Sequence, residues 1–191
     1  MSGKQAKILS DTEVQLLLHF ACRTRNPLRN RVLVLMSAKA GLRAGEIAAL
    51  TWDMVIGPQG QVGTVIELRD SAAKMGSGRL IPIHAELAKA LTAWRKASAH
   101  SHHVVCSERG GQMTPLSIVV WFNRAFHELG LNGCSSHSGR RTFITRAARL
   151  VHRAGGSLRD VQLLAGHRSI QTTQGYIDGD SAAQHKLVSL I

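Results

Sequence analysis

The chain has 191 residues, 44% of them hydrophobic, which is enough for one globular domain with a substantial core. Its 24 lysines and arginines face only 12 aspartates and glutamates, so the formal charge is +12 and we expect a polyanionic partner such as nucleic acid. The sequence has no apolar run long enough for a bilayer and no secretion signal, which favours a cytoplasmic protein. Its three dispersed cysteines indicate neither a disulfide framework nor a structural zinc site.

Helix start and stop signals dominate the first fifty residues. Ser10 and Glu13 form a capping-box pattern, which predicts a helix to about Arg23. Pro27 suits the first position of a second helix, and Gly41 suits its left-handed end. The next expected elements are a short helix over 44–50 and short strands over 52–56, 64–69 and 79–83.

Helical patterns return in the second half of the chain. Thr114 and Pro115 are typical of a helix cap and first residue, and Ser135 and Ser136 can cap a later helix. The helices expected here span 85–99, 115–129, 136–153, 157–164 and 169–176. The sequence therefore predicts a mainly α (α+β) fold, a helical bundle with a small three-stranded antiparallel sheet, in a single domain over 1–180.

Five side chains that carry or can carry positive charge precede the only tyrosine of the chain. They are Arg43, Lys74, His137, Arg140 and His167, and the tyrosine is Tyr176. Glu46 follows Arg43 at a helix start and can hold its guanidinium, whereas Lys74 lies in the loop between two expected strands. His137 and Arg140 are three residues apart and share one face of a helix.

This combination fits phosphodiester chemistry. Phosphoryl transfer needs an in-line nucleophile, positive charge on the nonbridging oxygens and a proton for the leaving oxygen. Arg43 and Arg140 are permanently charged forks that suit bidentate phosphate contact. A tyrosine, with an ordinary pKa of about 10, needs adjacent positive charge or a base before it attacks. Tyr176 is therefore the candidate nucleophile, and the scattered acids predict no metal site built from paired carboxylates.

The ordered set resembles the tyrosine recombinase (phage integrase) family over residues from about 10 to 180. That pattern has an arginine in Gly-Leu-Arg-x-x-Glu, a hairpin lysine, His-x-x-Arg, Gly-His, and a tyrosine about nine residues later. Each piece alone is weak, but the ordered set is specific. Gly139 stands where the family usually has leucine and Arg141 where histidine is common. Glycine lowers helix stability by up to about 1 kcal/mol relative to alanine, so the first departure concerns local packing.

The resemblance implies a role for each residue of a recombinase catalytic domain. Arg43, Arg140 and His167 are expected to bind the DNA phosphate, and Tyr176 to form a 3′-phosphotyrosyl bond. By the same resemblance His137 is the general base, Lys74 the general acid for the departing 5′-oxygen, and Glu46 a supporting residue. No cofactor is expected.

The resemblance also implies partners and a domain organisation. The expected partners are double-stranded DNA and further recombinase protomers, in a tetramer on paired sites, which implies a nucleoid-associated protein. Catalytic-domain sequence begins almost at the first residue, so no N-terminal core-binding domain is expected. The amphipathic tail 181–191 is expected either to dock on a neighbouring protomer or to fold back on its own core.

Other interpretations of the same residues are open. A type IB topoisomerase-like enzyme uses similar chemistry, and a DNA-binding or regulatory protein could retain the fold. Arg43 with Glu46 could be an ordinary surface ion pair. The histidines His100, His102 and His103 could be metal ligands, although a serine-rich loop without an adjacent cysteine or acid favours a plain loop.

Overall fold

The structure, a computed structural model, describes residues 6–74, 76–98, 101–176 and 188–189. Its central element is helix α2 (Pro27–Ala40), which packs against α1 (Asp11–Cys22), α4 (Ala85–Ala97) and α6 (Ser138–Leu150). Residues 32–38 are buried on every side, as expected for a helix enclosed by others. The predicted start and end of α2 are confirmed, since Pro27 is its first residue and Gly41 ends it with φ of 65°.

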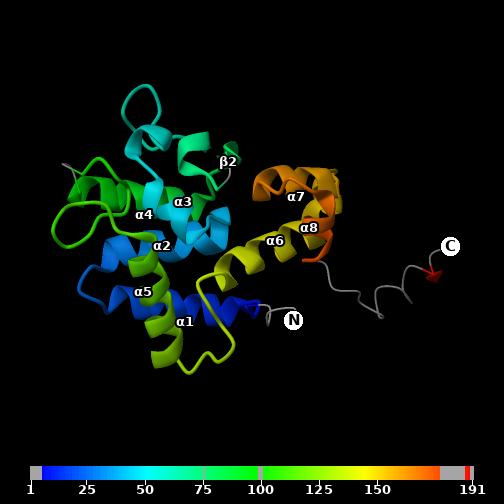
Figure 1. Cartoon of the computed structure of the whole chain (residues 1–191), viewed down its shortest axis with the longest axis horizontal. Coiled ribbons are helices and arrows are strands. Elements are labelled where there is room, and N and C mark those ends of the chain that lie inside the picture. Colours follow the sequence, from blue (N-terminus) through cyan, green and yellow to red (C-terminus); the bar gives the residue numbers. More distant parts are fainter. Residues whose placement is uncertain (1–5, 75, 99–100, 177–187, 190–191) are drawn as a thin grey trace.

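The structure has further elements beyond these four helices. They are α3 (Ala44–Ala49), β1 (Val65–Leu68), β2 (Arg79–Pro82), α5 (Pro115–Glu128), α7 (Leu158–Ala165) and α8 (Ile170–Gln174), with 3-10 turns at Trp52–Met54, Asp70–Ala72 and Val151–Ala154. Figure 1 shows α6, in yellow, running from the body formed by the earlier helices to α7 and α8 at its far end. The predominance of helix confirms the mainly α prediction.

The sheet differs from the expected three strands. In the described part of the chain it has two, β1 and β2, paired antiparallel with Val65 opposite Pro82 and Leu68 opposite Arg79. The expected strand at 52–56 was wrong. There the Val55 and Ile56 amides both donate to the Trp52 carbonyl, at 2.9 Å, so local bonds turn the chain.

Helix α6 also begins differently from the prediction. Its N-cap is His137, which makes no capping bond through its side chain, and the preceding serines lie outside the helix. The Ser135 amide instead donates to Ser138 Oγ at 3.0 Å. The helix therefore starts with its first turn at His137, a residue of the predicted site.

Two hydrophobic clusters form the core. The larger one joins α1 to α5 and the sheet, and the smaller one lies between α6 and α7, with Tyr176 packed against it. Within the described ranges, no helix combines the length and apolar character that a membrane crossing requires. Of the tail 181–191 only residues 188–189 are described, so its predicted docking lies outside the described residues, and the domain limits remain predictions.

Candidate active site

Arg140 lies at the junction of three elements. It projects from α6, is 2% exposed, and donates to the Gly41 carbonyl at 2.6 Å and to the Ala165 carbonyl at 2.7 Å. It therefore ties the ends of α2 and α7 together. Burial, and then repulsion by Arg43, lowers the pKa of Arg140 to about 10, which still leaves it charged at neutral pH. Within the described residues no carboxylate forms a direct ion pair with Arg140, although the charge of Glu46 acts on it.

His167 is held against Arg140. The left-handed Gly166, with φ of 64°, ends α7 and turns His167 inward, where it is 9% exposed. His167 Nε2 lies 3.0 Å from Arg140 Nη2, and Nδ1 lies 3.0 Å from Thr173 Oγ1. Burial, followed by the charges of Arg140, Arg43 and Arg79, lowers the pKa of His167 to about 4. The imidazole is therefore neutral at neutral pH.

Tyr176 lies face to face with His167. The two ring centroids are 5.3 Å apart with an interplanar angle of 27°. The backbone of Tyr176 is fixed from both sides, because its amide donates to the Thr173 carbonyl at 3.1 Å and its carbonyl accepts from Thr145 Oγ1 at 3.2 Å. The turn after α8 thus places the phenol of Tyr176 against His167, which in turn contacts Arg140.

His137 shares a pocket with the tyrosine. This pocket, of about 400 Å³, is lined by Ala6, Ser135, His137, Arg140, Arg141, Gln171, Thr172, Gly175 and Tyr176. Partial burial lowers the pKa of His137, and the positive charges of Arg140, Arg43 and Lys74 lower it further. The neutral imidazole, which can accept a proton, is therefore the form favoured beside Tyr176.

Arg43 and Glu46 form the ion pair that their spacing predicts. Arg43 is the N-cap of α3, and its Nη1 donates to Glu46 Oε1 at 2.6 Å while its amide donates to Oε2 at 3.0 Å. Glu46 is 1% exposed. Burial opposes its ionisation, but the hydrogen bonds and charges of Arg79 and Arg43 outweigh burial and lower the pKa of Glu46. The pair is thus an internal part of the site rather than a surface salt bridge.

Lys74 is less closely joined to the group. It is exposed in the loop between β1 and β2, and its described contact is through the backbone, where Ser77 Oγ donates to the Lys74 carbonyl at 2.8 Å. Its positive charge contributes to the lowered pKa of His137. The structure thus brings Arg43, Arg140, His137, His167 and Tyr176 together and leaves the Lys74 side chain free to approach a ligand.

Sequence reasoning missed Arg79. This side chain is 6% exposed and donates through Nη2 and Nη1 to both oxygens of Glu46, at 3.0 and 3.1 Å. Its Nε donates to the Leu164 carbonyl at 2.8 Å, just before the turn that carries His167. The alternation of side chains along β2 could have indicated Arg79, because Arg79 and the buried Ile81 point to the same face of the strand. A charged side chain on that buried face requires a partner of opposite charge.

The departure at Gly139 has a packing explanation. A Cβ atom there would lie 2.9 Å from the Cβ of Ser37 on α2, which is closer than side-chain atoms approach. Glycine therefore lets α6 pack closely on α2 at the turn that carries Arg140. Glycine lowers the helix propensity of α6, but it allows a close contact with α2 that a larger residue would prevent.

The described residues contain no group of three or more histidines, cysteines or acids that could hold a metal ion. His102 and His103 contact each other edge to face, with centroids 5.2 Å apart. His100 lies outside the described residues.

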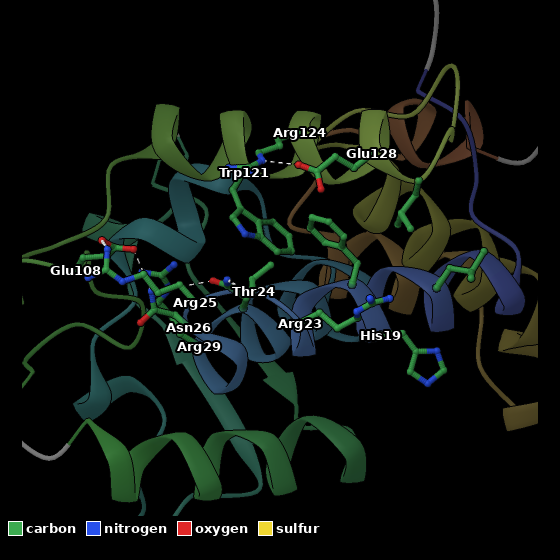
Figure 2. A pocket seen from close by; sticks show the side chains of 14 residues that line it. His19, Arg23, Thr24, Arg25, Asn26, Arg29, Glu108, Trp121, Arg124 and Glu128 are labelled. Atoms are coloured by element: carbon green, nitrogen blue, oxygen red, sulfur yellow. Dashed lines mark hydrogen bonds and ion pairs between the residues drawn. The ribbon is translucent and has the colours of Figure 1, made fainter.

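A larger pocket lies elsewhere in the described part of the chain. It measures about 790 Å³ and lies at the N-terminal end of α2, between α1 and α5, and none of the predicted site residues lines it. Figure 2 shows two of its arginines paired with acids, Arg25 with Glu108 and Arg124 with Glu128, each at 2.6 Å. Size alone therefore does not identify the site, because His137, the buried Arg140 and Tyr176 line the smaller pocket.

The helical fold and the cluster of arginine, histidine and tyrosine agree with the tyrosine recombinase family that the sequence resembles. The pattern of the phage integrase family matches residues 7–182, and the chain belongs to that family. Among curated proteins it is similar to the tyrosine recombinase XerC of Xanthomonas campestris pv. campestris, with 31% identity over 152 residues, which are 78% of this chain and 44% of that protein. The XerC of Rhizobium meliloti is 32% identical over 161 residues, which cover 81% and 46%. The chain thus spans about half the length of these relatives.

Solved structures confirm the fold. The XerA recombinase superposes with a TM-score of 0.76 at 23% identity, over 96% of this chain and 64% of that one. The XerH site-specific recombinase, in a post-cleavage complex with palindromic difH substrate, gives a TM-score of 0.76 at 20% identity, over 99% and 54%. The architecture expected from the sequence is the architecture of these recombinases.

Proposed function

We propose that the chain is the catalytic domain of a site-specific DNA recombinase or integrase. It cleaves and rejoins DNA strands through a 3′-phosphotyrosyl intermediate at Tyr176. The observation that carries the proposal is the stacking of Tyr176 on His167, which in turn contacts the buried Arg140. A protein that only binds DNA would not need a phenol held in this way.

Arg43 and Arg140 bind the phosphate in this proposal. Arg140 has no carboxylate partner in the described part of the chain, and Arg43 is 22% exposed at the start of α3. Two guanidinium forks, of which Arg140 lines the pocket, suit the nonbridging oxygens of a phosphodiester. A phosphate bound there would add the negative charge that favours a second proton on His167, which could then donate to the same oxygens.

The reaction moves one proton at each end of the phosphate. Tyr176 Oη attacks phosphorus, the new P–O bond forms as the bond to the 5′-oxygen breaks, and His137 accepts the phenol proton. Lys74, exposed on its loop, donates a proton to the departing 5′-oxygen. Attack by a 5′-hydroxyl on the phosphotyrosine reverses these steps and joins the strands, so the bond energy is conserved.

The proposed partners are double-stranded DNA and further copies of the recombinase, assembled as a tetramer on paired sites. The net charge of +12 supports the first, and the DNA-bound state of the similar XerH structure agrees with it. A lambda integrase dimer bound to a core site is a further structure of this fold. Such a protein would act at the nucleoid, in the cytoplasm.

The experiment is a cleavage assay on nicked duplexes taken from inverted repeats that flank the gene. We expect a detergent-resistant protein–DNA adduct that forms in EDTA and releases a strand with a free 5′-hydroxyl, which polynucleotide kinase can label. An adduct on the 5′ end would contradict the proposal. Relaxation of any supercoiled plasmid, whatever its sequence, would indicate a topoisomerase-like enzyme instead.

A further inference from the structure

Glu46 is shared by two arginines. Its Oε1 accepts from Arg43 Nη1 at 2.6 Å and from Arg79 Nη1 at 3.1 Å. Its Oε2 accepts from the Arg43 amide at 3.0 Å and from Arg79 Nη2 at 3.0 Å. Two cations therefore surround one buried anion, and the trio carries one net positive charge.

The two arginines differ in what else they can reach. Arg79 is 6% exposed and its remaining Nε donates to the Leu164 carbonyl, so it is committed to the protein. Arg43 is 22% exposed at the N-cap of α3, and its positive charge acts on Arg140, which lines the pocket of Tyr176. The surplus positive charge of the trio thus lies on the side where a phosphate would bind.

We propose that Arg79 is a positioning residue that neutralises Glu46 from the protein side and so leaves the charge of Arg43 available to the scissile phosphate. This inference rests on the proposed function, because it assigns Arg79 a part in phosphate binding and cleavage. Without Arg79, Arg43 and Glu46 would form a neutral pair. Glu46 would then repel the nonbridging oxygens from a buried site, where charge is poorly screened.

Arg79 also supports the neighbouring turn. Gly166 has φ of +64°, and a Cβ there would lie 2.8 Å from Arg79 Nη1, so the guanidinium is packed directly against the turn that presents His167. A merely structural Arg79 would act through this packing alone. The electrostatic and packing roles differ when Arg79 and the charge of Glu46 are both removed. The electrostatic role predicts that removing the charge of Glu46 restores activity, whereas the packing role predicts no recovery.

The test uses Arg79→Met, Glu46→Gln and the double variant. We expect Arg79→Met to slow single-turnover formation of the tyrosyl adduct by about 100-fold, the size of effect typical for loss of one preorganised charge contact. The double variant should react at least about 10-fold faster than Arg79→Met, since no uncompensated carboxylate remains. Arg79→Lys, which keeps the charge, should retain more activity than Arg79→Met.

The control is Arg31→Met. Arg31 pairs with Glu86 at 2.7 Å on the α2–α4 side of the molecule and lines neither the pocket nor the turn. Its loss should leave the adduct rate unchanged, and melting curves should show each variant folded. If the double variant is as slow as Arg79→Met or slower, with all proteins folded, the inference is wrong and Arg79 acts by packing.

A second measurement separates this inference from the proposed function. Inorganic phosphate is titrated into 15N-labelled protein, and the Nε–H signals of the arginines report its binding. We expect Arg79→Met to weaken phosphate binding at least about 10-fold and Glu46→Gln to restore it in the double variant. This pattern without any adduct in the parent chain would overturn the cleavage function alone, whereas an adduct without the pattern would overturn the role of Arg79.

Discussion

Arg140 Nη2 lies 3.0 Å from His167 Nε2. A guanidinium has donors only, so the imidazole must accept at Nε2 and carry its proton on Nδ1, toward Thr173 Oγ1 at 3.0 Å. The contact thus selects the neutral imidazole and one tautomer. Protonation of His167 would set two cations against each other in a buried site.

This relationship predicts a loss of stability in acid. The folded pKa of His167 is about 4, below its ordinary 6.5, so its contribution is complete above pH 6.5 and is lost as the pH falls through 4. At 1.36 kcal/mol per pKa unit, it amounts to about 3 kcal/mol of unfolding free energy. Urea denaturation between pH 7 and 4 measures it. His167→Gln should flatten this dependence, and an unchanged pH profile in that variant would contradict the assignment.

Replacing Gly139 by leucine, the residue usual in the family, should destabilise the protein. The new side chain would meet Ser37 on α2, and overpacking of this kind typically costs about 1–3 kcal/mol. Gly45, in α3, has open space within 4 Å of the position that a Cβ would take, so Gly45→Ala is the matched control and should stabilise by about 0.5–1 kcal/mol. Thermal melting compares the two. A Gly139→Leu protein as stable as the parent would show that α6 does not pack on α2 as described.

Lys74→Ala should slow cleavage without altering stability, because the side chain is exposed. Loss of a general acid costs about 10²–10⁴ in rate. A substrate with sulfur in place of the 5′-bridging oxygen should restore the rate, since a thiolate leaves without a proton. Lys89→Ala, at an exposed position on α4, is the control. If the sulfur substrate gave no recovery, Lys74 would not be the proton donor.

Local signals explain why much of the fold could be predicted. The capping box of Ser10 and Glu13 and the glycine end of α2 depend on residues close in sequence, and the structure has both. The segment 52–56 was wrongly predicted as a strand because Trp, Val and Ile favour strands. Local bonds to the Trp52 carbonyl turn this segment. Its start is held by a distant contact, the Trp52 amide donating to the His102 carbonyl at 3.1 Å, which no local pattern reveals.

The candidate site likewise combines residues that local motifs predict with contacts that only the fold creates. Residues of the ordered motif could be named from sequence. In the structure His137, Arg140 and Tyr176 line one pocket, and His167 contacts both Arg140 and Tyr176. The ion pair between Arg79 and Glu46 could not be predicted, because 33 residues separate its partners and only the fold brings β2 against α3. The close approach of Gly139 to Ser37 likewise depends on how two helices pack.

The central claim is that Tyr176 is the nucleophile, and as the only tyrosine of the chain it allows an unambiguous test. The measurement is adduct formation on a nicked substrate by the parent chain and by Tyr176→Phe, with mass spectrometry of the linked peptide. The account predicts a 3′-linked DNA fragment on Tyr176 in the parent and no adduct in the variant, which keeps the ring stacked on His167 and should still bind DNA. An adduct of equal yield in Tyr176→Phe would contradict it.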